Sequence, residues 1–177
     1  MIIQQDTRQK KQHHVRKEQW FAENGIKVIN SKLLVGDYMI PNDGSVSVDT
    51  KKDMSELYSN LIQSHTRFRA ECDLAREIGI QLYVLVENED GITCIDEITK
   101  WQNPLFFVYK KKLRQGLKCK PPVNNVQLKK VLHSMERDHG VKFLFCSPKD
   151  SARIIVDLLT HGEYDHEIPD NKACQMA

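Results

Sequence analysis

The sequence has no long apolar run, and no stretch approaches the roughly 20 apolar residues that a membrane-spanning helix needs. Its first residues, MIIQQDTRQKK, carry no apolar segment after a basic start, so we expect no secretory signal. The five cysteines are scattered, odd in number and never in CxxC spacing. This pattern predicts reduced thiols in a cytoplasmic protein and argues against a zinc site.

Acidic residues are absent from one long interval, although the net charge of the whole chain is only +2. Between Glu97 and Glu136 there is no Asp or Glu, while nine Lys and Arg residues occur there. Such asymmetry is typical of a surface that contacts polyanions, and a solvated basic loop is the other interpretation of the same interval. The chain of 177 residues, 40% of them hydrophobic, is long enough for one domain with a real core.

Strand and helix patterns alternate along the chain, which predicts an α/β fold with a mixed central β-sheet flanked by helices. On the helix that ends at Asn24, Val15, Trp20 and Phe21 mark the apolar side and Lys17 the solvated side. Gly116, Pro121 and Pro122 predict loops in the basic, aromatic run 105–122. The expected strands are 1–5, 26–30, 81–88 and 141–147, with a hairpin over 33–50 and further helices over 53–63, 65–78, 124–139 and 148–162.

The hairpin carries the residues with the clearest chemistry. Side chains alternate across a strand, so in SVSVDTK the side chains of Asp49 and Lys51 share one face, about 7 Å apart along the strand. A turn centred at Asp43 or Gly44 would set Asp37 opposite or diagonal to Asp49, where cross-strand Cβ atoms lie roughly 5 Å apart. The pattern therefore predicts two carboxylates and one lysine in a single cluster.

Two carboxylates this close repel each other unless a cation lies between them. Carboxylate oxygens with open coordination positions suit Mg²⁺ or Mn²⁺, which retain waters and bind substrate phosphates. A bound ion would activate a water and polarise a scissile phosphate, and Lys51 would orient that water, help to deprotonate it or stabilise developing charge. Asp6, at the end of the first strand, could join the cluster. Ordinary polar residues on a solvated hairpin are the alternative.

The ordered set of short motifs resembles the XPF-type nuclease domain of the PD-(D/E)XK superfamily. That family has DTR or DxR after a first strand, then GD, then an acidic residue, one residue and Lys; here these are 6–8, 36–37 and 49–51. The resemblance covers about residues 1–90. It implies a restriction-endonuclease-like fold and a metal-dependent DNA endonuclease. It also implies Asp37 and Asp49 as metal ligands, Lys51 as the catalytic lysine and Asp6 as a further acidic ligand.

Some family features are missing or changed. Thr50 stands where the family has arginine, and Ser55 stands where it has a further acidic residue. No tandem helix-hairpin-helix module follows, so its duplex grip and dimer partner are not implied. A homodimer would suit the cutting of symmetric junctions. The WQNP segment and the C-terminal helices look more like small phage-encoded relatives, whose location would be the host cytoplasm.

Several charged residues outside the hairpin are candidates for substrate contacts. Arg8, Arg67 and Arg69 are candidate phosphate contacts, and a solvated helix face is the alternative for them. Glu71 is a candidate accessory acid or a partner for an arginine. Glu87 closes a buried strand, where functional groups gather in α/β folds and where ordinary solvation of a sheet end is equally consistent.

The basic, aromatic segment 100–123 is a candidate nucleic-acid surface. Trp101, Phe106, Phe107 and Tyr109 adjoin a run of cations, a combination that suits base stacking and phosphate contacts. Core packing is the alternative for the aromatic side chains. The candidate nucleic-acid contacts in this run are Lys110, Lys111, Lys112 and Arg114.

We therefore expect one nuclease domain over 1–162, with a C-terminal helix-strand-helix at 124–162 and an acidic, frayed tail at 163–177. Its expected function is Mg²⁺- or Mn²⁺-dependent hydrolysis of DNA. Branched or flap DNA in recombination, repair or phage DNA processing is the expected substrate. A non-catalytic DNA-binding module on the same fold and a nuclease acting on RNA remain open alternatives, and no membrane partner is expected.

Overall fold

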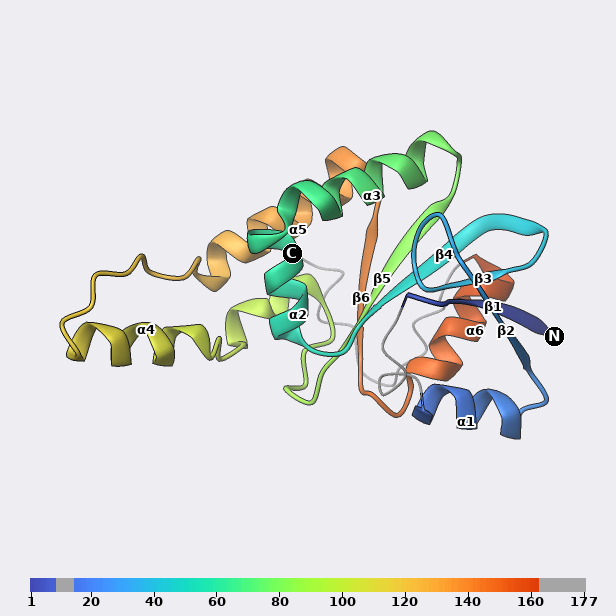
Figure 1. Cartoon of the computed structure of the whole chain (residues 1–177), viewed down its shortest axis with the longest axis horizontal. Helices are drawn as coiled ribbons and strands as arrows, with labels where there is room; N and C mark the ends of the chain where they lie inside the picture. The colour runs from blue at the N-terminus through green and yellow to red at the C-terminus, as the bar shows by residue number, and fades with distance from the viewer. Residues whose placement is uncertain (9–14, 163–177) are drawn as a thin grey trace.

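A mixed sheet forms the centre of the molecule (Figure 1). The computed structural model describes residues 1–8 and 15–162, and within these ranges the sheet has six strands in the order β2-β1-β3-β4-β5-β6. Only β3 runs antiparallel to its neighbours, so the other five strands end at one edge, where β3 begins. The strands are β1 (Ile2–Asp6), β2 (Lys27–Ser31), β3 (Tyr38–Ile40), β4 (Asp43–Lys51), β5 (Gln81–Glu87) and β6 (Lys142–Cys146).

Helices cover both faces of the sheet, as the alternating pattern predicts. One core lies under α2 (Met54–Tyr58), α3 (His65–Glu77) and α5 (Asn125–His139). The other lies under α1 (Val15–Glu23) and α6 (Ser151–His161), on the opposite side in Figure 1. The remaining helical segments are the π-helical turn η2 (Ser59–Gln63), the 3-10 helix η3 (Ile95–Lys100) and α4 (Leu105–Arg114).

Local signals in the sequence explain where several helices begin and end. The Asp53 carboxylate accepts a hydrogen bond from the Glu56 amide at 2.7 Å and so caps one of the free N–H groups in the first turn of α2. Asn124 and Gln127 form a complete capping box at the start of α5. Gly140 ends that helix in the left-handed conformation, at φ 71°.

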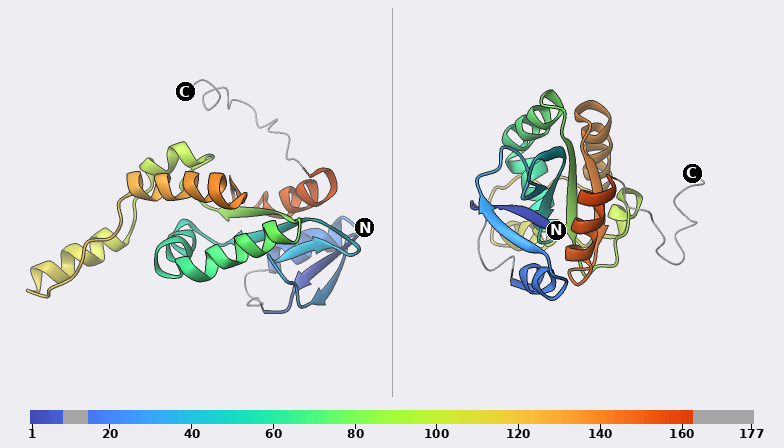
Figure 2. Two further views of the ribbon diagram at one scale, coloured as in Figure 1. Left: turned by 90° about the horizontal axis from the view of Figure 1, so that it is seen from above. Right: turned by 90° about the vertical axis from the view of Figure 1, so that its right-hand side faces the viewer.

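The run 105–122, expected as loops, contains the helix α4. Leu, Lys and Arg favour helices, and Gly116 lies just beyond the last turn at φ 75°, where its amide bonds the Leu113 carbonyl at 3.0 Å. The glycine therefore ends a helix instead of preventing one. No residue of α4 is buried, and Figure 2 shows the helix projecting from the body of the molecule.

The hairpin turn lies two residues earlier than expected. Ile40 pairs with Asp43, so Pro41 and Asn42 form the loop, and Asp43 and Gly44 already belong to β4. Asn42 supplies the left-handed conformation at φ 66°, which asparagine tolerates better than most residues.

The face of α1 also differs from the expectation. Val15 is 62% exposed, whereas Lys17 is only 4% exposed and lies one turn before the fully buried Phe21. Residues 9–14, in the approach to this helix, and the tail 163–177 lie outside the described residues. Among the helices that are described, none is long and apolar enough to cross a membrane.

Candidate active site

The sheet topology gathers polar side chains at one edge. Asp6 ends β1 and Asp37 immediately precedes β3. Asp49 and Lys51 lie among the last three residues of β4. Five strands end at this edge and β3 starts there, so residues far apart in the chain become neighbours. All four side chains line one open cavity of about 920 Å³.

The hairpin holds Asp37 beside Asp49. Tyr38 pairs with Val48, which sets the preceding Asp37 opposite Asp49, and the Asp37 amide donates to the Val48 carbonyl at 2.8 Å. The Thr50 amide and hydroxyl both donate to Oδ2 of Asp37, at 2.7 and 2.8 Å. Thr50, which replaces the family's arginine, therefore fixes the orientation of the Asp37 carboxylate.

Asp49 and Lys51 share one face of β4, as the strand alternation predicts. Lys51 Nζ lies 2.5 Å from Asp49 Oδ2, and both side chains are less than a tenth exposed. The ammonium also lies 5.4 Å from the centre of the Phe68 ring on α3. Burial lowers the pKa of Lys51, but the charges of Asp49 and Asp37 outweigh burial and raise that pKa above its ordinary value. Lys51 is therefore cationic at neutral pH.

Two carboxyl groups of this cluster, those of Asp37 and Glu71, have raised pKa values. Burial, followed by the negative charge of Asp49, raises the pKa of Asp37 well above its ordinary value, although Lys51 and Thr50 oppose the shift. Burial and Asp49 also raise the pKa of Glu71 on α3. Buried like charges of this kind are stabilised by a nearby cation.

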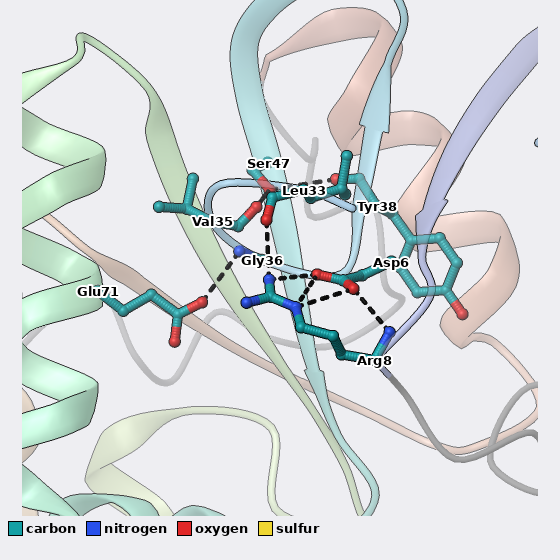
Figure 3. Close-up of polar contacts among 8 residues, drawn as sticks. All are labelled: Asp6, Arg8, Leu33, Val35, Gly36, Tyr38, Ser47 and Glu71. Carbon is teal, nitrogen blue, oxygen red and sulfur yellow. Dashed lines mark hydrogen bonds and ion pairs between the residues drawn. The ribbon is translucent and has the colours of Figure 1, made fainter. Parts of the chain in front are cut away.

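A tight loop before β3 fits against α3 and β4 (Figure 3). The Gly36 amide donates to Oε1 of Glu71 at 3.1 Å, and the Ser47 hydroxyl donates to the Val35 carbonyl at 2.9 Å. Gly36 has φ 66°, and a Cβ placed there would lie 2.2 Å from Ser47 Oγ. Only glycine fits this position, and the neighbouring Asp37 depends on it for its placement.

Asp6 is engaged by Arg8 instead of pointing freely into the cluster (Figure 3). The Arg8 guanidinium bonds both carboxylate oxygens and also donates to the Leu33 carbonyl at 2.8 Å. Burial opposes ionisation of Asp6, yet the bonds from Arg8 outweigh it and lower the pKa of Asp6. The role of Asp6 as a metal ligand stays a prediction.

The residues that the structure describes fit a divalent cation held by two carboxylates, Asp37 and Asp49, and not one held by three or more protein ligands. Across residues 1–8 and 15–162, no group of three or more His, Cys, Asp or Glu side chains is arranged as metal ligands. Oδ2 of Asp49 is buried and accepts no hydrogen bond, although the Lys51 ammonium pairs with it by charge. Mg²⁺ commonly takes one or two carboxylates and completes its shell with water and phosphate, which two carboxylates beside an open cavity allow.

The remaining candidates fall into different places. Arg67 lines the cavity from the first turn of α3, whereas Arg69 lies 3.7 Å from Asp73 and does not line it. Trp101 is 6% exposed and belongs to the core, while Phe107 is 73% exposed on α4. The four cations predicted to contact nucleic acid are all exposed on α4: Lys110, Lys111, Lys112 and Arg114.

Sequence reasoning missed Thr50 as a donor to Asp37 and placed Lys17 in solvent. Strand alternation gave no signal for Thr50, because it places that side chain on the face opposite Asp49; the contact arises because Asp37 lies just before β3 and outside the regular strand. Lys17 left no signal in the helical pattern, because its burial depends on the strand that α1 packs against. It lines the same cavity as the carboxylates.

A mixed sheet with two carboxylates and a lysine at its carboxyl edge defines the restriction-endonuclease-like class of nuclease folds. The model of the ERCC4 domain matches residues 5–158, and the chain belongs to this family. Nucleases of this family typically depend on a divalent metal ion. The predicted resemblance to XPF-type nucleases and the predicted fold class are thereby confirmed.

Solved structures of XPF from Aeropyrum pernix have the same fold. One has a TM-score of 0.59 at 17% identity, covering 90% of this chain and 63% of that chain. Another, described as a complex with DNA, has a TM-score of 0.56 at 18% identity, covering 89% of this chain and 62% of that one. The chain thus spans less than two thirds of these relatives. No curated protein sequence matches it significantly.

Proposed function

We propose that this chain is an Mg²⁺- or Mn²⁺-dependent DNA endonuclease that hydrolyses phosphodiester bonds, with branched or flap DNA as its substrate. The observation that carries the proposal is the meeting of Asp37, Asp49 and Lys51 in one open cavity. Membership of the ERCC4 family supports it, as does the XPF structure described as a complex with DNA. A homodimer and a cytoplasmic location stay predictions.

The two aspartates would hold the divalent ion, which when bound lowers the pKa of a coordinated water and polarises the phosphate. In hydrolysis the water oxygen bonds to phosphorus, the bond from phosphorus to one sugar oxygen breaks, and that oxygen takes up a proton. Lys51 is cationic at neutral pH, so the role that fits it is stabilising the negative charge that develops on the phosphate. Thr50 keeps Asp37 in position for this chemistry.

Other residues would bind the substrate or support the site. Arg67 lines the cavity and is exposed, which suits a phosphate contact. Glu71 accepts a hydrogen bond from the Gly36 amide and would support the site by holding that loop in place. Arg8 orients Asp6 and closes the loop at Leu33. The cations of α4 lie on a projecting helix and would contact DNA beyond the cavity.

The test is cleavage of labelled branched and linear DNA by the native chain with Mg²⁺ or Mn²⁺. Asp49→Ala and Lys51→Ala should each reduce the rate by at least about 100-fold, because each removes charge that acts in the transition state. Asp90→Asn and Lys27→Ala change exposed charges outside the cavity and should cut normally.

Two other outcomes would replace the proposal. Salt-sensitive DNA binding by the native chain without cleavage in either metal would identify a non-catalytic binding module. Faster cleavage of matched RNA than of DNA would identify a ribonuclease. Cleavage by Asp49→Ala and Lys51→Ala at the native rate would show that this cavity is not the site of the chemistry.

A further inference from the structure

A second lysine is buried at the same edge of the sheet. Lys17, on α1, forms an ion pair with Glu87, the last residue of β5, seventy positions later in the chain. Lys17 is 4% exposed and Glu87 8% exposed. The pair joins a helix on one face of the sheet to the end of an interior strand.

Stability alone does not account for this pair. Taking two charges out of water costs about as much as their attraction returns, and apolar side chains of similar volume are commonly neutral or stabilising at such places. Apolar packing is available here. Phe21 lies one turn further along α1, and Cys146 on β6 lies beside Glu87 in the register of the sheet. An ion pair retained among apolar neighbours therefore points to a role for one of its charges.

The two members of the pair face different surroundings. Lys17 lines the cavity that Asp37 and Thr50 line, whereas Glu87 is not among the lining residues. Burial, then the charges of Asp37 and Glu87, raises the pKa of Tyr38, so both carboxylates lie near that ring. Glu87 thus pairs with the lysine from outside the cavity, and Lys17 lines the same cavity as Asp37.

Lys17 and Lys51 both line the cavity and are associated with helices that pack on opposite faces of the sheet. Lys51 lies over Phe68, which belongs to the core under α3, whereas Lys17 comes from α1 on the other face. An ammonium group has three N–H donors, and the contact with Glu87 engages one of them. A nucleic-acid strand bound in the cavity would therefore lie against a wall that includes both lysines.

We propose that Lys17 is a substrate-contacting residue that binds a backbone phosphate of the strand in the cavity, and that Glu87 is its positioning residue. The proposal rests on the proposed nuclease function and extends it to a second wall of the site. One phosphate contact of this kind contributes about 0.7 to 0.9 to the slope of log affinity against log salt. It contributes to binding the substrate more than to the chemical step.

The test compares the native chain with Lys17→Met and with the double variant Lys17→Met/Glu87→Met. The single variant leaves Glu87 buried without its partner and can lose stability for that reason alone. The double variant removes both charges, keeps the net charge of the chain and fills a similar volume. Arg16→Met, at an exposed position on the same helix, is the matched control for loss of one cation.

The double variant should melt within a few degrees of the native chain, which circular dichroism checks. Its KM for DNA should rise roughly tenfold with kcat changed less than about threefold, as expected for a lost binding contact. With EDTA, fluorescence anisotropy should show the salt slope of DNA binding shallower by about 0.7 to 0.9. Arg16→Met should keep the native KM within about twofold.

A folded double variant with native KM and native salt slope would overturn the proposal and leave the pair as a structural link. An equal loss of kcat and kcat/KM with an unchanged salt slope would also overturn it, because that pattern excludes a phosphate-binding contact. Failure of the native chain to cut or bind nucleic acid would instead overturn the proposed function. The two failures are therefore distinguishable.

Discussion

Replacing Asp37 by asparagine should stabilise the protein while it removes activity. Asp37 is 8% exposed, and its pKa is raised by burial and by the negative charge of Asp49. An asparagine amide oxygen can still accept the two hydrogen bonds from Thr50, and its NH₂ group can donate toward Asp49. The substitution therefore removes a charge and keeps the contacts that orient the side chain.

The size of the stabilisation expected for Asp37→Asn follows from the geometry of the hairpin. Facing residues of an antiparallel pair have Cβ atoms about 5 Å apart, and at an effective dielectric constant of about 20 two unit charges at that distance repel by roughly 3 kcal/mol. The attraction of Asp37 to Lys51 offsets part of this repulsion. We expect a net stabilisation of about 1 to 2 kcal/mol, which is a rise in Tm of roughly 2 to 8 °C.

The pH dependence has a definite sign. The folded-state pKa of Asp37 is raised above its ordinary value of 3.8, so proton binding stabilises the native fold below pH 3.8. That contribution is lost as the pH rises from 3.8 through the folded-state pKa. Thermal melts in EDTA should therefore give the same Tm for the variant and the native chain in acid. Toward pH 7 the Tm of the variant should rise above that of the native chain.

A divalent ion should reverse the order of stability. Mg²⁺ or Mn²⁺ that binds only the folded native site raises its Tm, whereas Asp37→Asn should gain little. Asp90→Asn, at an exposed position, is the matched control and should stay within about 0.5 kcal/mol of the native chain. A variant less stable than the native chain at pH 7 in EDTA would refute the reasoning from burial and repulsion.

Two further substitutions test the loop and the projecting helix. Gly36→Ala should destabilise the fold by about 2 to 3 kcal/mol and slow cleavage, because its Cβ would lie 2.2 Å from Ser47 Oγ at φ 66°. Gly25→Ala, at φ 68° with open space around it, should cost only about 1 kcal/mol, and equal losses in denaturant melts would contradict this account. Replacing two exposed α4 lysines should make the salt slope of DNA binding shallower by about 1 to 2, whereas replacing two exposed lysines at the starts of β2 and β6 should not. The two double variants, matched in charge, are Lys111→Gln/Lys112→Gln and Lys27→Gln/Lys142→Gln.

Local chemistry explains what could be predicted. The alternation of SVSVDTK fixes that Asp49 and Lys51 share a face, whatever surrounds the strand. The caps at Asp53 and Asn124 are contacts within a few residues of chain, so their spacing carries the signal. The glycine before Asp37 carries a conformational signal as well, although the sequence does not show that Ser47 fills the space beside it.

The predictions failed where the structure depends on contacts distant in the chain, or where two local signals of similar strength compete. The turn lies at Pro41 and Asn42 and not at Asp43 and Gly44. Asn42 and Gly44 can both take the left-handed conformation, and the pairing of Ile40 with Asp43 selects Asn42. Gly116 and the two prolines after α4 indicate where a helix must stop. They carry no information about the ten residues before them, which form the helix. Lys17 resembles any surface lysine until α1 packs beside the end of β5.

The sequence by itself determined the chemistry of the hairpin, namely two acids and a lysine whose spacing is set by the pleat of a strand and the return of a turn. Only the tertiary structure decided what joins them. Strand order and direction bring the ends of β1, β4 and β5 to one edge, so Asp6 reaches the cavity of the hairpin carboxylates, which also gains Lys17 with its partner Glu87. Such contacts depend on chain segments tens of residues apart, and no local spacing encodes them.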